Sequence, residues 1–276
     1  MIKIVTDSVA DIPRQVAEKF EINVLPLNIN INENTYQDGI NITPEQICNY
    51  IRNDHIPKTS QVTPRDFFQA FERLTSNGDE VIAITMSSQL SNTYNSALIS
   101  SQQLPDRKIA VLDSMGVSLG QGLQVIEAAK MAFAGRSFEE IIERIKILRR
   151  RMNYSIIIDT LDYLFKGGRI SKAQYIAGNL LNLNLVCGSD GTGKIMVKEK
   201  FRGNEKSILR WISRHIAKLN LTNKIVGINT VNNDKLLNEV KILIEKHNPQ
   251  EIIMSQIGST VACYAGPNAI GVFAEE

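Results

Sequence analysis

The chain has 276 residues, of which 43% are hydrophobic, and this content excludes a largely disordered protein. Its 31 Lys and Arg residues nearly balance 29 Asp and Glu residues, which leaves a net charge of +2. The balance argues against nucleic acid as a partner, because proteins that bind it concentrate positive charge against the phosphates. The length suggests one large or two modest domains.

The N-terminal residues enter a strand-like pattern directly, without the charged and apolar regions of a secretory signal. No apolar run approaches the roughly 18 residues that are typical of a membrane span. The three cysteines, Cys48, Cys187 and Cys263, lie far apart and fit free thiols in a reducing compartment. Neither they nor the three histidines have the spacing of zinc ligands, so no metal is predicted. These features predict a cytoplasmic protein.

Short apolar runs rich in β-branched residues alternate with helical segments along the chain. Five runs are predicted to be buried parallel strands, namely residues 2–5, 24–27, 81–85, 109–112 and 156–158. Between these strands, Thr43 and Thr63 are predicted to be helix N-caps, because each is a hydroxyl residue followed by a proline, which is favoured at the first position of a helix. Ser137 and Glu140 form a capping box, which places the start of a third helix.

The alternation continues less regularly in the second half of the chain. Strands are predicted at residues 195–200, 225–228 and 252–255, and helices at 207–219 and 235–246. We therefore predict an α/β fold of two α/β domains, with a mainly parallel sheet in the N-terminal one. The domains are expected to span residues 1–155 and 156–276 and to meet at a cleft that holds the ligand site.

Hydroxyl and carboxylate side chains follow four predicted strands, in segments 6–8, 85–88, 113–114 and 159–160. Because ligands bind beyond the carboxyl ends of parallel strands, these segments would converge on one polar rim. The alternative is that each segment caps the helix that follows it. Segment 87–93 has more hydroxyls than one cap requires, and the helical residues after it favour an anion site there.

Two further segments are candidates for the site. In residues 166–171, Gly167 and Gly168 fit a helix C-cap and Ser171 fits the N-cap of the next helix. These caps leave Arg169 unexplained, and its guanidinium suits a carboxylate or a phosphate. Residues 264–269 have the composition of a turn.

Two catalytic motifs match incompletely. Residues 188–194 resemble a phosphate-binding P-loop, but Ile195 stands where the magnesium-binding Ser or Thr is needed, so a hairpin turn is predicted. Residues 116–120 match the nucleophile elbow of α/β-hydrolases, which would make Ser118 the nucleophile of a serine esterase. Neither His215 nor His247 is well placed as its base. The esterase therefore remains the alternative hypothesis.

Taken together, these segments resemble the DegV family, whose characterised members bind fatty acids. The resemblance follows the chain in order through Thr6-Asp7-Ser8, Thr59-Ser60-Gln61, Ser87 to Tyr94, Asp113-Ser114, Gly167 to Ser171 and residues 258–271. The family fold has two α/β domains with a fatty acid between them and its tail in an apolar tunnel. The resemblance implies that Thr59 and Ser91 hydrogen-bond the carboxylate, with Tyr264 beside them.

The resemblance also implies a function and partners. FakB-type members of the family present the acid to a separate kinase, FakA, which makes acyl-phosphate for phospholipid synthesis. A carrier of this kind has no catalytic residue and no cofactor, and its ligand is a long-chain fatty acid. Transient contact with a membrane is compatible with this role. Arg169 and Arg202 match positions tied to presentation or docking. Further candidates for the head-group or docking site are Ser88, Thr93 and Gly266.

The chain departs from the family pattern near the head group. Tyr264 replaces the usual histidine, Asn268 replaces a glycine in the same segment, and Asn92 replaces the glycine of LSG. A tyrosine hydroxyl can hydrogen-bond a carboxylate, but it stays neutral where a histidine can become cationic. A DegV-like protein that binds a different apolar acid is therefore a further alternative. The length and saturation of the acyl chain and the oligomeric state do not follow from the sequence.

Overall fold

The computed structural model describes residues 1–178 and 183–276. Its helices are the 3-10 helix η1 (Ser8–Ala10), α1 (Arg14–Lys19), α2 (Pro44–Arg52), α3 (Pro64–Thr75), α4 (Thr93–Gln102), α5 (Ser118–Phe133), α6 (Phe138–Arg151), α7 (Asp162–Lys166), α8 (Lys172–Gly178), α9 (Glu205–Ile216), α10 (Asp234–Glu245) and α11 (Ser259–Ala265). Its strands are β1 (Ile2–Asp7), β2 (Asn23–Leu25), β3 (Asn28–Ile31), β4 (Asn34–Gln37), β5 (Lys58–Ser60), β6 (Glu80–Thr85), β7 (Ile109–Asp113), β8 (Met152–Ile158), β9 (Asn184–Ser189), β10 (Ile195–Phe201), β11 (Ile225–Thr230), β12 (Glu251–Gln256) and β13 (Ile270–Glu275).

The N-terminal half contains a four-stranded parallel sheet with the order β2-β1-β6-β7. The first four predicted strands are all present, although β2 covers residues 23–25 rather than 24–27. Pro26 follows β2 directly, and a proline has no N–H with which to continue a strand ladder. The expected α/β fold with a mainly parallel N-terminal sheet is confirmed.

The second half contains a six-stranded sheet with the order β10-β9-β8-β13-β11-β12. Residues 156–158 lie in β8 as predicted, but β8 is antiparallel to both neighbours, so the expected parallel direction is wrong. A continuous apolar run indicates that both faces of a strand are buried, but it does not indicate whether the neighbouring strands are parallel or antiparallel to it. The later predicted strands correspond to β10, β11 and β12, and the predicted helices to α9 and α10.

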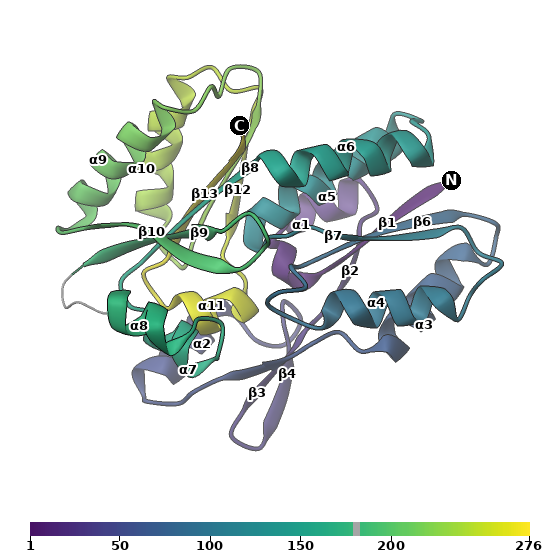
Figure 1. The fold of residues 1–276 in the computed structure, drawn as a ribbon, viewed down its shortest axis with the longest axis horizontal. Helices are drawn as coiled ribbons and strands as arrows, with labels where there is room; N and C mark the ends of the chain where they lie inside the picture. The colour runs from purple at the N-terminus through teal and green to yellow at the C-terminus, as the bar shows by residue number, and fades with distance from the viewer. Residues whose placement is uncertain (179–182) are drawn as a thin grey trace.

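A third, small antiparallel sheet has the order β4-β3-β5 and shares no strand with the two large sheets (Figure 1). Its strands have only three or four residues each, which is too short for a recognisable apolar pattern, and they were not predicted. In β5, Thr59 pairs with Ile29 of β3. This short strand fixes the position of one predicted head-group residue.

The predicted helix starts are confirmed in atomic detail. Thr43, Thr63 and Ser137 are N-caps of α2, α3 and α6, and each forms a full capping box. In α6 the hydroxyl of Ser137 accepts the N–H of Glu140, and the Glu140 carboxylate accepts the N–H of Ser137 at 2.9 Å. Basic residues end this helix at Arg151, where the helix dipole favours cations.

Helix α5 lies between the two large sheets. One apolar cluster joins Leu119 of α5 to Ile82 of β6 and to Phe273 of β13. On the outer face of the six-stranded sheet, α9 and α10 form a separate core with β11 (Figure 1). We propose that the domains divide at residues 155 and 156, a point that falls within β8.

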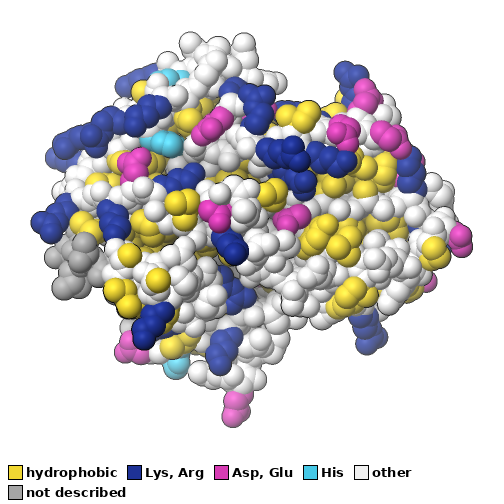
Figure 2. Space-filling model, in the orientation of Figure 1, with side chains coloured by type: hydrophobic (Ala, Val, Ile, Leu, Met, Phe, Trp, Pro, Cys, Tyr) yellow, Lys and Arg dark blue, Asp and Glu magenta, His cyan; other side chains and the backbone are white. Residues whose placement is uncertain are grey.

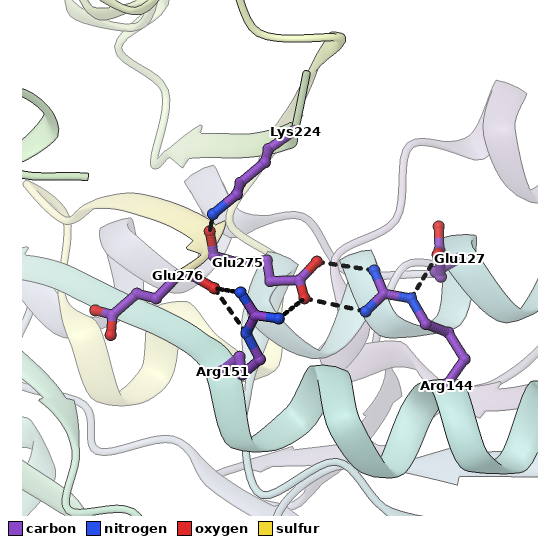
Figure 3. Close-up of polar contacts among 6 residues, drawn as sticks. All are labelled: Glu127, Arg144, Arg151, Lys224, Glu275 and Glu276. Carbon is purple, nitrogen blue, oxygen red and sulfur yellow. Dashed lines mark hydrogen bonds and ion pairs between the residues drawn. The ribbon is translucent and has the colours of Figure 1, made fainter. Parts of the chain in front are cut away.

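Ion pairs connect the two halves on one side of α6. Figure 3 shows Arg144 donating to both carboxylate oxygens of Glu275, at 3.0 and 2.8 Å, and to Glu127 at 2.9 Å. Arg151 lies 3.5 Å from the same Glu275 carboxylate, and Lys224 donates to the Glu275 carbonyl oxygen at 3.0 Å. These five contacts form a clamp between α5, α6 and the end of β13.

The visible surface carries both signs of charge. Figure 2 shows Lys and Arg side chains spread over several elements of the viewed face, with Asp and Glu side chains among them. None of the helices in residues 1–178 and 183–276 is both long and apolar enough to cross a membrane. Within the same residues, no cluster of His, Cys, Asp and Glu could hold a metal ion.

Candidate functional site

A cavity of about 660 Å³ lies where the four-stranded, six-stranded and small sheets meet. Its walls come from both halves of the chain and are largely apolar. The apolar side chains that line it are Val9, Leu27, Met86, Leu90, Met115, Val117, Ile156, Ile158, Leu164, Cys187, Ile195 and Val261. A cavity of this size and composition is suited to an elongated apolar ligand.

The walls of the cavity follow from strand alternation. In β8, Tyr154, Ile156 and Ile158 all line the cavity, because alternate residues of a strand share one face. Cys187 of β9 pairs with Ile156 and lines the same wall. Burial raises the pKa of the Cys187 thiol to about 12, so the thiol stays protonated and behaves as part of the apolar wall.

The polar end of the cavity contains the hydroxyls of Thr59 and Tyr264, which are hydrogen-bonded to one another at 2.6 Å. They come from β5 and α11 and are 205 residues apart in sequence. Tyr264 was expected in a turn, but it lies in the last turn of α11, and the turn begins only at Gly266. Glycine and proline at 266–267 end the helix after Ala265, so the turn begins two residues later than the composition indicated.

The serine-rich segment at residues 87–93 forms the other side of this polar end. Ser88 and Ser91 line the cavity, whereas Thr93 is fully buried and its hydroxyl bonds Ser91 Oγ at 2.9 Å. Ser91 Oγ also accepts the N–H of Thr93, the first residue of α4, at 3.2 Å. The N–H of Ser88 donates to the Asp113 carboxylate at 3.3 Å. The segment therefore both caps the start of α4, through Ser91, and lines the cavity, through Ser88 and Ser91.

Arg169 lines the cavity and joins its two polar sides. Its Nε donates to the carbonyl of Leu90 at 3.2 Å, and its Nη1 donates to the carbonyl of Gly167 at 2.6 Å. The guanidinium lies 4.9 Å from the centre of the Tyr264 ring, in a cation–π contact. Gly168 has a φ of +72°, as the predicted helix C-cap requires. Arg169 thus brings a positive charge to the rim of the cavity.

Tyr264 is neutral in this setting. Burial raises the pKa of its hydroxyl above the usual value, although the hydrogen bond with Thr59 and the charge of Arg169 act in the opposite direction. A neutral hydroxyl can donate a hydrogen bond to a carboxylate. Asn268, the second departure from the family pattern, donates instead to Asp159 at 2.7 Å.

Besides Thr93, two predicted residues lie outside the lining of the cavity. Gly266 has a φ of +79° and ends α11, and a Cβ at this position would come within 2.7 Å of the Tyr163 ring. Arg202 is exposed and follows β10 directly. Neither position contacts the cavity, so they do not contribute to a head-group site inside it.

Several residues of the cavity were not predicted from the sequence. The P-loop-like segment is the hairpin turn that was predicted, but its residues Gly193 and Lys194 also line the cavity. The carbonyl of Gly193 accepts a hydrogen bond from Ser87 Oγ at 2.9 Å, which brings the hairpin against the serine-rich segment. The glycines were the only signal, and they indicate a turn without indicating what the turn covers.

Ser118 does not have the surroundings of a catalytic nucleophile. Its side chain is fully buried and outside the cavity lining, and its hydroxyl donates to Asp11 at 2.6 Å and accepts from Asn229 at 2.7 Å. Burial raises the pKa of the Asp11 carboxyl well above its usual range. His215 is engaged elsewhere, by a stacking contact with Trp211 and a hydrogen bond with Ser155. The esterase hypothesis is therefore not supported.

Comparison with known proteins places this architecture in a family. The family profile described as "Uncharacterised protein, DegV family" matches residues 1–276. The chain belongs to the DegV family. A DegV domain-containing protein of Caldanaerobacter subterraneus is 37% identical over 278 residues, which cover 100% of this chain and 99% of that protein. The corresponding protein of Clostridium acetobutylicum is 36% identical and covers 99% of this chain and 97% of its own.

Solved DegV structures share the fold over the full length. A DegV family protein from Thermus thermophilus, described by its fatty acid binding, has a TM-score of 0.92 and 28% identity and covers 100% and 99% of the two chains. DegV from Bacillus subtilis, described as a fatty acid binding protein, has a TM-score of 0.87 and 26% identity with the same coverage. A stearic acid-binding protein from Eubacterium ventriosum has a TM-score of 0.88 and 26% identity, covering 100% and 98%. The expected fold of two α/β domains is that of these DegV structures.

Proposed function

We propose that this DegV protein binds a long-chain fatty acid in the cavity between the sheets. The observation that carries the proposal is an apolar cavity with hydroxyls from both halves of the chain at one end. Burying an acyl tail in such walls contributes about 0.8 kcal/mol per methylene. The head group must keep hydrogen-bond partners, since a buried carboxylate without them is strongly unfavourable. Solved relatives described as fatty acid binding support the same ligand class.

In this proposal Thr59, Ser91 and Tyr264 hold the carboxylate. All three line the cavity, and Thr59 and Tyr264 are already in hydrogen-bond contact. Ser88 and Arg169 lie on the same rim, where the guanidinium attracts the anionic head group. Thr93 acts indirectly, because its hydroxyl bonds that of Ser91 and so orients it.

We further propose that the protein is a carrier without catalysis of its own, which presents the bound acid to a separate fatty acid kinase resembling FakA. The acyl-phosphate made by that kinase would then serve phospholipid synthesis. Arg202 is exposed outside the cavity lining and belongs, in this proposal, to the surface that meets the kinase or transiently contacts a membrane. Gly266 is buried, and in this proposal it contributes only by ending α11 beside Tyr264. A cytoplasmic location is consistent with three cysteines that are free and buried.

The first experiment is denaturing extraction of the purified protein followed by lipid mass spectrometry. We expect a long-chain acid to be recovered either directly or after incubation with oleate. Recovery of no acyl chain under both conditions would refute the proposed ligand. Recovery of a different apolar acid would keep the cavity as the site and replace the ligand class.

The second experiment tests the head-group assignment. Ser91→Ala should weaken fatty acid binding by roughly tenfold, because it removes one hydrogen bond to a charged group. Ser101→Ala, in the helix α4 that follows Ser91, is a matched control, since the Ser101 hydroxyl bonds the carbonyl of Leu98 and lies outside the cavity lining. Equal affinity in the two variants would remove Ser91 from the site. Acyl-phosphate formation with ATP and an added fatty acid kinase would test presentation separately.

A further inference from the structure

Helix α11 carries a cavity residue of the C-terminal half, yet it begins at a residue without a side chain. Tyr264, in its last turn, lines the cavity and bonds Thr59 of β5. The N-cap of the helix is Gly258, which cannot supply a side-chain cap. The first N–H groups of a helix have no partner within the helix, and in a protein interior they need one. The partners for α11 therefore come from elsewhere in the chain.

Two carboxyl groups of the N-terminal half accept N–H groups at the start of α11. Asp11, which follows η1, accepts the N–H of Gly258 at 2.9 Å. Asp38, which follows β4, accepts the N–H of Ser259 at 3.0 Å. Both acids are buried, with exposed fractions of 7% and 4%. The Ser259 hydroxyl adds a third contact by donating to the carbonyl of Ile42 at 3.1 Å. The start of α11 is thus held by residues more than two hundred positions earlier in the sequence.

The two carboxyl groups are themselves fixed by the N-terminal half. The second oxygen of Asp38 accepts the hydroxyl of Ser8, in η1, at 2.9 Å. The second oxygen of Asp11 accepts the hydroxyl of Ser118, at the start of α5, at 2.6 Å. A carboxyl group has an acceptor oxygen whether it is ionised or protonated, so these contacts do not require a charge. Each acid therefore links α11 to a helix of the other half of the chain.

The close approach of Asp11 explains why residue 258 is a glycine. A Cβ at Gly258 would lie 2.4 Å from Oδ1 of Asp11, which is too close for two non-bonded atoms. The φ of Gly258 is −65°, an angle that other residues adopt readily, so the backbone itself does not require a glycine. Neither Asp11, Asp38 nor Gly258 lines the cavity. Any effect of these residues on a ligand is consequently indirect.

We propose that Asp11 and Asp38 are positioning residues for the fatty acid and act through Tyr264, an inference that rests on the proposed fatty-acid-binding function. The two acids fix the start of α11, and its last turn then holds the Tyr264 hydroxyl against Thr59 and the head group. Hydrogen bonds weaken steeply when their distance and angle change, whereas each apolar contact contributes little. A shift of α11 should therefore reduce the affinity mainly at the Tyr264 hydroxyl.

The test measures the oleate affinity of delipidated Asp38→Ala and Gly258→Ala, each made alone and together with Tyr264→Phe. Asp38→Ala removes one of the two acceptors, and Gly258→Ala displaces the other. Each should weaken binding roughly three- to tenfold, because a loss that acts through one hydrogen bond cannot exceed the loss on deleting that bond. In the Tyr264→Phe background the same changes should cost less than about twofold, since changes that act through one contact are not additive. Asp38→Asn keeps an acceptor oxygen and should recover most of the affinity that Asp38→Ala loses.

Asn233→Ala is the matched control. Asn233 caps α10, in the separate core beside β11, by accepting the N–H of Leu236 at 3.0 Å, and it lies outside the cavity lining. This variant should lower the temperature of thermal unfolding and leave the oleate affinity unchanged. Thermal unfolding also shows which variants fold, and Gly258→Ala keeps the test decisive if Asp38→Ala does not.

Three results would overturn the positioning role. They are equal losses with and without the Tyr264 hydroxyl, wild-type affinity in folded Asp38→Ala and Gly258→Ala, and no recovery in Asp38→Asn. Failure of the wild type to bind oleate would instead refute the proposed function, on which this inference rests.

Discussion

Replacing Arg144 by methionine tests whether the clamp in Figure 3 stabilises the association of α6 with β13. The side chains of Arg144 and Glu275 are only 30% and 17% exposed, and two parallel N–H bonds join them. Exposed ion pairs contribute about 0.2–1 kcal/mol, whereas breaking a buried pair costs about 3–5 kcal/mol. Because Arg151 stays 3.5 Å from Glu275, we expect an intermediate loss of about 2 kcal/mol in the free energy of unfolding.

Arg136→Met is the matched control, and urea unfolding followed by circular dichroism is the assay. Arg136 pairs with Glu140 at 3.5 Å, and its side chain is 62% exposed, so the control should lose less than about 0.5 kcal/mol. Arg144 lowers the pKa of Glu275, so the contribution of the clamp is present above about pH 4 and is lost as the pH falls. The wild type and Arg144→Met should therefore converge in stability in acid. Equal losses in the two variants, or a difference that persists in acid, would refute this reasoning.

Two further predictions concern the site and the buried acids. Tyr264→Phe keeps the ring beside Arg169 but removes the hydroxyl, and it should weaken fatty acid binding roughly tenfold in a titration. Tyr36→Phe is the control and should leave the affinity unchanged, because the Tyr36 hydroxyl contacts Tyr50 and lies outside the cavity lining. Burial raises the pKa of Asp7 to about 6, so the protonated carboxyl contributes stability that is present below about pH 4 and is lost as the pH rises to about 6. Asp7→Asn should remove about 3 kcal/mol of this pH-dependent fall in urea titrations. Equal pH slopes in both proteins, or unchanged affinity in Tyr264→Phe, would contradict these expectations.

Local features of the fold were predictable because they depend on neighbouring residues alone. A hydroxyl three residues before a Gln, Asp or Glu, at the start of a helical pattern, is typical of a capping box, and Thr43, Thr63 and Ser137 each form one. The strands of the parallel sheet were also identified, since burial on both faces produces continuous apolar runs. These signals operate within one turn or one strand.

The site depends on contacts that no local pattern contains. The resemblance identified Thr59 and Tyr264, but only tertiary packing shows that their hydroxyls are 2.6 Å apart. The antiparallel direction of β8 depends on its pairing with β13, a strand that lies more than a hundred residues later in the sequence. Tyr154 lines the cavity without belonging to any motif, because its place depends on Gly116 and Gly120, more than thirty residues earlier, which leave space for its ring.

The place of β13 in the six-stranded sheet has a consequence for synthesis of the protein. This strand, formed by residues 270–275, lies between β8 and β11 and pairs with both. While residues 270–275 remain inside the ribosome, β8 and β11 have emerged with exposed strand edges and no partner between them. Such edges are prone to pair with other chains. The nascent protein thus passes through a stage that favours chaperone binding, and that stage ends when β13 inserts.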